Sequence, residues 1–277
     1  MAVNYAKKFE KATSDLLVAK RKSQAFTNQN YNWTGVNSIV VTTLTDPVIG
    51  AYTPSGSNRY GSPTEVEDTE QEWTLSRDRA WTKTIDKKSS ADKMMIKKPG
   101  KYLAQATKNV LAPEIDTYIF SIIGAAIATA AIGDHTITAA TTSLTAYKDF
   151  TNLNAAITNS EVPEEGRVAA VTPTFYNFYK QSNVLDASDL GLKDRKGGVV
   201  GMIDGVKIIL VPASRMPANT DVIIGHPGAV CAPEKLVDYT LHNNPPGLSG
   251  DLLEYRHRYD AFVDTNWAKA LARHKTS

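Results

Sequence analysis

The residues in this sequence that could do chemistry are few, and they are not arranged as a known catalytic or metal site. The single cysteine, Cys231, follows His226 closely, and such a pair could form a thiol–imidazole dyad. The segment GHPGAVCAP is interrupted by Gly and Pro, however, and Cys231 has small apolar neighbours, which favours a buried structural cysteine. The other histidines lack the spacing of metal ligands. They are His135, His242, His257 and His274.

Nucleotide-binding and hydrolase motifs are also missing from the sequence. The Gly-rich stretch GGVVGMIDG (197–205) lacks the GxGxxG spacing and the Lys-Ser/Thr pair of a phosphate-binding loop, and there is no GxSxG or HExxH pattern. Glu254 and Asp260 fall on one face of a predicted strand opposite arginines, where cross-strand salt bridges explain them. We therefore predict no enzyme, metal or cofactor. An α/β enzyme with its site in residues 135–235 is an alternative that no motif supports.

The composition is that of an ordinary globular protein. Of the 277 residues, 42% are hydrophobic and 22% are charged, and the formal net charge of +2 predicts no protein-wide attraction for nucleic acid. One cysteine excludes an intrachain disulfide and fits a reducing compartment. Residues 117–133 carry no charge, but they are at the short end of the about 17–25 residues that span a bilayer. Their Ala, Gly, Ser and Thr content favours a buried helix.

The elements that organise the chain begin with a long extended ribbon. Residues 38–45 and 69–86 are predicted to be β-strands, and the connection between them is rich in Pro, Gly and Ser. Loops of this length are uncommon inside compact domains, and two strands alone are marginally stable in water. Alternate residues of the second strand share a face that carries both Trp73 and Trp81. We therefore predict that another copy of the chain completes this hairpin.

The charges along and after this ribbon are segregated by sign. An acidic stretch without any basic residue precedes a mainly basic stretch. Opposed blocks in a nearly neutral chain suit self-association through complementary patches, and two solvated faces without a partner are the alternative. The acidic residues are Glu65, Glu67, Asp68, Glu70 and Glu72, and the basic residues are Arg77, Arg79, Lys83, Lys87, Lys88, Lys93, Lys97, Lys98 and Lys101.

The N-terminal segment is predicted to be an arm. Residues 3–24 have the apolar spacing of an amphipathic helix, and the polar stretch that follows contains Tyr31 and Trp33. We interpret the segment as lying across a neighbouring surface, and a helix folded onto its own domain is the alternative. The lysines of this helix could also touch phosphates non-specifically, which leaves a DNA-binding accessory protein as a second alternative function.

The rest of the chain alternates between predicted helices and strands. A mainly helical segment, 91–132, is expected to break near Pro99 and to kink or restart near Pro113. A second helix start is the Thr172-Pro173 pair, an N-cap followed by proline. Residues 251–263 alternate between two faces, which predicts a strand with one solvent or interface face. Further predicted strands are 135–142, 167–172, 206–211 and 221–225, a further helix is 146–159, and 183–200 is a predicted mobile loop.

The order of these parts resembles that of the major capsid proteins of tailed bacteriophages, which have the HK-ninety-seven-type capsid fold. Several local stretches are similar to that family, and the resemblance spans nearly the whole chain. No single stretch is diagnostic, so their joint order carries the resemblance. The stretches are SGSNRYGSPTEVEDT (55–69), TIDKKSSADKMM (84–95), GVVGMIDGVKIILVP (198–212), IIGHPGAVCAPEKL (223–236) and GDLLEYRHRYDAFV (250–263).

The resemblance implies an α+β protein whose copies, as hexamers and pentamers, form the icosahedral virion capsid around double-stranded DNA. It implies assembly in the host cytoplasm with a portal, non-specific contact with the DNA, and no membrane. Because only a short arm precedes the hairpin, we expect a separate scaffolding protein, and we predict no covalent crosslink. The implied parts are an N-terminal arm (1–35), an extended β-hairpin loop (36–90), a spine helix with the peripheral domain (91–135), an axial α/β domain (136–250), and a C-terminal strand and tail (251–277).

The candidate subunit-interface residues lie on the arm and the hairpin. Trp73 and Trp81 are the expected anchors, because large aromatic side chains often dominate interface energies. Ion pairs at exposed rims contribute only about 0–1 kcal/mol each, so the charged candidates are expected to specify register more than to stabilise. The candidates are Tyr31, Trp33, Arg59, Tyr60, Glu70, Glu72, Trp73, Arg77, Arg79 and Trp81.

Overall fold

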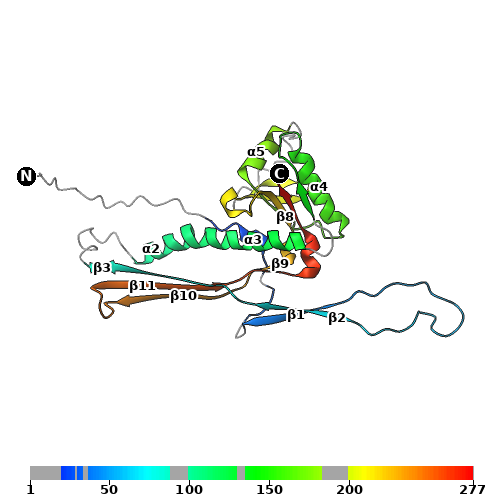
Figure 1. Cartoon of the computed structure of the whole chain (residues 1–277), viewed down its shortest axis with the longest axis horizontal. Coiled ribbons are helices and arrows are strands. Elements are labelled where there is room, and N and C mark those ends of the chain that lie inside the picture. The colour runs from blue at the N-terminus through cyan, green and yellow to red at the C-terminus, as the bar shows by residue number, and fades with distance from the viewer. Residues whose placement is uncertain are drawn as a thin grey trace, which may run out of the picture.

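The chain is built from three parts that are distinct in Figure 1. An α/β domain stands above an elongated layer, in which a long helix lies over a three-stranded sheet, and a two-stranded ribbon projects beyond that layer. The predicted helix 3–24 and the predicted loop 183–200 fall almost entirely outside the described residues. The computed structural model describes residues 20–28, 30–33, 37–87, 99–129, 135–182 and 199–276.

A mixed six-stranded sheet forms the α/β domain, with the strand order β4-β13-β8-β5-β7-β6. The C-terminal strand β13 lies between β4, to which it is parallel, and β8, to which it is antiparallel. Every residue of β5 is buried, as expected for a central strand that is covered on both faces. The strands are β4 Thr136–Thr138, β13 Leu271–Lys275, β8 Thr220–Gly225, β5 Val168–Val171, β7 Val206–Leu210 and β6 Val199–Ile203.

Two helices of this domain were predicted from the sequence, and the structure confirms both. Helix α4 (Ala146–Asn159) covers the predicted range and buries an apolar stripe that includes Phe150 and Leu153. Helix α5 (Pro173–Gln181) begins as predicted, because the side chain of Thr172 accepts a hydrogen bond from the backbone N–H of Phe175. The buried faces of both helices belong to the main hydrophobic core.

The long helix contains one irregular turn. Helix α2 (Pro99–Ala106) passes through a π-helical segment, η2 (Thr107–Leu111), into helix α3 (Ala112–Thr129). Pro113 has no N–H to donate and would clash with a regular turn before it, so the wider π turn relieves the conflict. The predicted disturbance near Pro113 is therefore confirmed as a π segment just before it.

The long helix lies along a three-stranded antiparallel sheet with the order β10-β11-β3 (Figure 1). Strand β11 shows the predicted alternation, since four alternate residues from Leu253 to Tyr259 are buried. Strand β10 follows Pro233 and was not predicted. The bounds are β10 Glu234–Asn243, β11 Gly250–Tyr259 and β3 Asp78–Asp86.

The projecting ribbon pairs strand β1 (Ser38–Leu44) with strand β2 (Asp68–Thr74), and residues 45–67 form its distal loop. The prediction of a single strand over 69–86 is wrong. Strand β2 ends at Thr74, and strand β3 begins at Asp78 in a different sheet, paired with β11. The two strands alternate as expected, but the corner between them turns the chain from the ribbon into the elongated layer.

Short elements join the three parts near the root of the ribbon. Strand β9 (Val230–Cys231) pairs with β12 (Phe262–Val263), and Cys231 is buried as predicted. Burial raises the pKa of the Cys231 thiol to about 11, so the thiol is unsuited to act as a nucleophile at neutral pH. The remaining 3₁₀ elements are η1 Ser23–Phe26, η3 Ala213–Arg215, η4 Pro227–Ala229 and η5 Thr265–Ala270.

Candidate assembly interface

The root of the ribbon is fixed by an aromatic cluster within the chain. The Trp73 ring stacks on Phe262 with centroids 5.5 Å apart, and Trp33 stacks on Phe262 at the same distance. Tyr31 meets Trp73 edge-on at 5.1 Å. Trp73 is only 6% exposed and Trp33 only 8%. These two tryptophans are therefore already buried by their own chain, so Trp73, one of the two expected anchors, is not free to anchor a neighbour.

Trp81, the other expected anchor, has a different setting. It lies on β3 directly opposite Tyr255 of β11 and stacks on it at 5.6 Å. Its other neighbour is Tyr102 of α2, edge-on at 5.9 Å. The Trp81 side chain is half-buried, so part of its surface stays open to solvent. A role for Trp81 in a contact between subunits remains a prediction.

One carboxylate accepts four hydrogen bonds at the corner between β2 and β3. Asp260 Oδ2 accepts hydrogen bonds from the backbone N–H of Ser76 at 2.8 Å and from its hydroxyl at 2.9 Å. Asp260 Oδ1 accepts from the Tyr118 hydroxyl at 2.6 Å and from the backbone N–H of Ala261 at 2.8 Å. The expectation that Asp260 forms cross-strand salt bridges with arginines is therefore wrong. Burial and the bond to Asp260 raise the pKa of Tyr118 to about 12.

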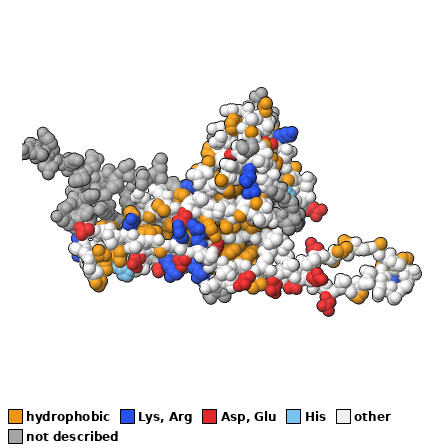
Figure 2. Space-filling model, in the orientation of Figure 1, with side chains coloured by type: hydrophobic (Ala, Val, Ile, Leu, Met, Phe, Trp, Pro, Cys, Tyr) orange, Lys and Arg blue, Asp and Glu red, His pale blue; other side chains and the backbone are white. Residues whose placement is uncertain are grey.

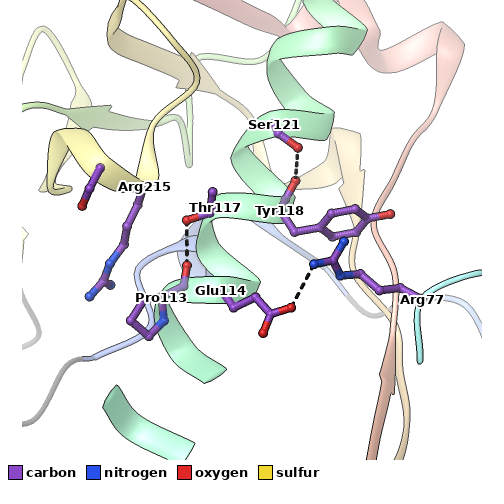
Figure 3. A pocket seen from close by; sticks show the side chains of 8 residues that line it. Arg77, Pro113, Glu114, Thr117, Tyr118, Ser121 and Arg215 are labelled. Atoms are coloured by element: carbon purple, nitrogen blue, oxygen red, sulfur yellow. Dashed lines mark hydrogen bonds and ion pairs between the residues drawn. The ribbon is translucent and has the colours of Figure 1, made fainter. Parts of the chain in front are cut away.

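Two arginines beside this corner bind the long helix. Arg77 lies 4.2 Å above the Tyr118 ring and donates to the Tyr259 hydroxyl and to Glu114 Oε1, both at 2.9 Å. Arg79 donates to the same Glu114 oxygen at 2.6 Å. Burial disfavours the charge on Glu114, but the hydrogen bonds from the two arginines outweigh that effect and hold its pKa below the ordinary value. Figure 3 shows Glu114 reaching from α3 towards Arg77.

A groove of about 470 Å³ crosses the exposed face of α3 at this point. Arg77 lies on one side of the helix and Arg215 on the other, with the helix hydroxyls between them (Figure 3). Among the described residues, neither Nη1 of Arg77 nor Nη2 of Arg215 has a hydrogen-bond partner. The lining residues are Arg77, Pro113, Glu114, Thr117, Tyr118, Ser121, Ser214 and Arg215.

A buried ion pair next to the groove receives the N-terminal segment. The Asp116 carboxylate is fully buried and accepts hydrogen bonds from the backbone N–H groups of Lys22 and Ser23 at 2.9–3.1 Å. Arg215 Nη1 donates at 2.9 Å both to Asp116 Oδ2 and to the carbonyl oxygen of Lys20. These bonds therefore hold residues 20–23, the first described residues of the chain, against α3.

The ribbon carries a row of acids on one face. Asp68, Glu70 and Glu72 alternate along β2 with Gln71 and Trp73, so their side chains point away from the aromatic cluster. All three are exposed, and none forms an ion pair with any residue that the structure describes. On β1, Val40 and Leu44 lie opposite Glu72 and Asp68 and are also exposed. Figure 2 shows acidic side chains, in red, along the projecting ribbon.

The distal loop of the ribbon exposes apolar side chains. Val48, Ile49 and Tyr60 are each more than 90% exposed. Arg59 folds back to donate to the carbonyl oxygen of Gly56 at 3.2 Å, and Tyr60 meets Tyr52 at 5.2 Å. Several exposed apolar side chains on one projecting loop are typical of a surface that another molecule covers.

The ten predicted interface residues therefore fall into separate groups. Those at the ribbon root and at the corner make contacts with other parts of the chain, while Arg59, Tyr60, Glu70 and Glu72 are exposed on the ribbon and its distal loop. Sequence reasoning missed Tyr118 and Arg215 and gave Asp260 the wrong partners, because the partners of all three are far away in the chain and leave no local signal.

Other chemistry in the described part of the chain is limited. No group of three or more His, Cys, Asp or Glu side chains there could hold a metal ion. His274 is fully buried, with its Nε2 3.6 Å from Asp149 and its Nδ1 4.0 Å from Asp221. One helix, Tyr102–Thr129, is long and apolar enough to cross a membrane, but its residues Ile119 and Ile123 pack into the main core.

Comparisons with known proteins identify the fold. No protein-family model and no curated protein matches the chain. A structure described as Mycobacterium phage Che8 is 16% identical, with a TM-score of 0.76 over 99% of this chain and 98% of that one. A chain from the capsid structure of the cyanophage P-SCSP1u is 14% identical, with a TM-score of 0.77 over 99% and 93%. A chain from the asymmetric unit of the bacteriophage PhiM1 mature capsid is 13% identical, with a TM-score of 0.74 over 99% and 92%. The chain has the fold of these structures, which confirms the predicted α+β, HK-ninety-seven-type class.

Proposed function

We propose that this chain is the major capsid protein of a tailed bacteriophage and that its copies assemble into an icosahedral shell around double-stranded DNA. The observation that carries the proposal is the projecting ribbon, within a chain that matches phage capsid structures along nearly its whole length. The ribbon buries its root in its own chain but leaves its distal loop and one strand face uncovered.

The distal part of the ribbon makes few contacts with its own chain, so in this proposal it is stabilised by contact with another copy. Two strands and a long loop are marginal in water, and the exposed Val48, Ile49 and Tyr60 add apolar surface that a neighbour would cover. Hexamers and pentamers supply that neighbour for every copy. Each contact is small, and many contacts per subunit make the shell stable through avidity.

The remaining parts have mechanical roles in this proposal. The long helix and the three-stranded sheet are the peripheral domain, and the α/β domain faces the axis of each hexamer or pentamer. The chain acts structurally and performs no catalysis. A separate scaffolding protein and a portal take part in assembly in the host cytoplasm, and the packaged DNA is touched without sequence preference.

The test is to purify the chain and raise its concentration while following its size by sedimentation velocity and negative-stain microscopy. Uniform shells, or hexamers and pentamers, are the expected products. A variant in which a short turn replaces residues 46–67 keeps the root cluster and is the matched control, and it should fold but fail to assemble. A full-length chain that stays monomeric at every concentration, both alone and when coexpressed with the scaffolding protein, would refute the proposal.

A further inference from the structure

The first described residues of the chain are attached to the rest of the molecule at two points. At one point, the buried carboxylate of Asp116 on α3 accepts hydrogen bonds from the backbone N–H groups of Lys22 and Ser23. At the other point, the guanidinium of Arg21 forms an ion pair with Glu234, the first residue of β10. Both side chains of this ion pair keep some contact with solvent, so a change of charge nearby can alter it.

A buried histidine faces the same carboxylate. His257 of β11 is only 3% exposed, and its Nε2 lies 3.5 Å from Oε2 of Glu234, whereas Oε1 of Glu234 binds Arg21. Neither ring nitrogen of His257 has a hydrogen-bond partner among the described residues. A neutral imidazole gains little from a carboxylate at that distance, but an imidazolium would form an ion pair with it. Glu234 therefore faces one permanent cation, Arg21, and one group that can become a cation, His257.

The surroundings of His257 keep it neutral at neutral pH. Burial is the largest effect that lowers the pKa of His257, and the nearby charge of Arg21 lowers it further. Glu114 of α3 acts in the opposite direction, but its carboxylate is already bonded to Arg77 and Arg79. The charged and titratable groups that face or flank the ring are Arg21 from the N-terminal segment, Glu234 from β10, Arg79 from β3, Glu114 from α3, and Tyr255 and Tyr259 from β11 itself.

Arg21 and a proton on His257 oppose each other. Two cations beside one carboxylate repel, and the repulsion is stronger where burial limits screening by water. Because the bound Arg21 makes His257 harder to protonate, a proton on His257 must weaken the binding of Arg21 by the same factor. An imidazolium also competes directly for Glu234, whose Oε2 it already faces. The hydrogen bonds to Asp116 involve no histidine, so acid should act first on the ion pair of Arg21.

We propose that His257 and Glu234 form an acid-sensitive attachment for the first described residues of the chain. When His257 takes up a proton from solvent, Glu234 pairs with the imidazolium instead of Arg21, and residues 20–23 loosen from β10. At neutral pH the ion pair with Arg21 holds these residues in place, and in acid they are free to move or to contact another molecule. The attachment lies within one chain, so it goes beyond the proposed function and does not depend on it.

Hydrogen exchange of the full-length chain, below the concentration at which it assembles, tests this attachment. The amides of Lys22 and Ser23 should lose at least about fivefold in protection between about pH 7.5 and about pH 5, after correction for the intrinsic exchange rate. Amides of β5, inside the six-stranded sheet, report global unfolding. The loss at Lys22 and Ser23 should exceed the loss there.

Two histidine variants separate this attachment from other effects of acid. His257→Phe keeps an aromatic ring at the buried position but cannot take up a proton, so the protection of the two amides should no longer depend on pH beyond the change in β5. His242→Phe is the matched control, because His242 also faces a glutamate, Glu254 at 3.1 Å, but is exposed. This control should show the same pH dependence as the wild type.

Arg21→Gln gives the reciprocal measurement and leaves the buried histidine in place. The pKa of His257, followed by NMR, should be higher in this variant than in the wild type, because the repelling charge is gone. An unchanged pKa would overturn the proposal, as would wild-type amides that keep their protection in acid or a His257→Phe variant that retains the wild-type pH dependence. If His257→Phe fails to fold, as judged by circular dichroism, the Arg21→Gln titration decides the question.

Discussion

The corner between the ribbon and the elongated layer should depend on one carboxylate, and Asp260→Asn tests this. The change keeps the shape of the side chain but removes its charge and one of its two acceptor oxygens. Four donors point at this carboxylate: two from Ser76, one from Tyr118 and one from Ala261. An amide can accept from the donors on one side only, and its NH₂ group faces the donors on the other.

The expected loss of stability follows from those bonds. A hydrogen bond to a charged group contributes about 1.5–3 kcal/mol, and a buried donor left unpaired costs about 1–3 kcal/mol. The two hydroxyl donors can rotate to accept from the new NH₂ group, but a backbone N–H cannot. We therefore expect Asp260→Asn to lower the free energy of unfolding by about 2–4 kcal/mol. That is a large part of the about 5–15 kcal/mol that is typical of a folded domain.

Two measurements check this expectation. Urea unfolding of the unassembled chain gives the change in stability, with Asp238→Asn as the control, because Asp238 is exposed and the change there should stay within about 0.5 kcal/mol. Ultraviolet titration of tyrosine ionisation gives the second readout. The pKa of Tyr118, about 12 in the wild type, should fall but stay above its ordinary value, since burial still raises it. Unchanged stability together with an unchanged Tyr118 titration would refute the reasoning.

Three further changes probe other parts of the molecule. Trp73→Ala should lower the free energy of unfolding by about 3–5 kcal/mol, and half-buried Trp81→Ala by clearly less; urea unfolding that ranks them in the opposite order would contradict the burial of the root cluster. Burial holds the pKa of His274 below its ordinary value despite the opposing effect of nearby carboxylates, so the unfolded chain takes up the proton at higher pH and stability falls as the pH drops through about 6.5. His274→Gln should flatten that pH dependence in unfolding experiments, and an equally steep curve would count against it. Thr172→Ala should remove the N-cap of α5 and cost about 1 kcal/mol, with Thr172→Ser as a control that retains the hydroxyl.

Some features of this protein are local, and the sequence alone determined them. The alternation along residues 251–263 predicted which side of β11 is buried, because side chains of a strand point alternately to its two faces. The apolar spacing of 146–159 and the Thr172-Pro173 pair predicted two helices with the correct starts. The separation of acidic and basic blocks is also readable directly, and the structure shows the acids of β2 exposed.

Other features depend on contacts between distant residues, and only the tertiary structure decided them. The alternation over 69–86 runs through two strands of different sheets, because each strand has its own buried face and the pattern does not say which strand lies beside it. At the break Ser76 donates hydrogen bonds to Asp260, which lies far along the chain. For the same reason Trp73, expected at a contact between subunits, is buried on Phe262 of its own chain. A residue's type and spacing report that it needs burial, whereas the fold decides which surface buries it.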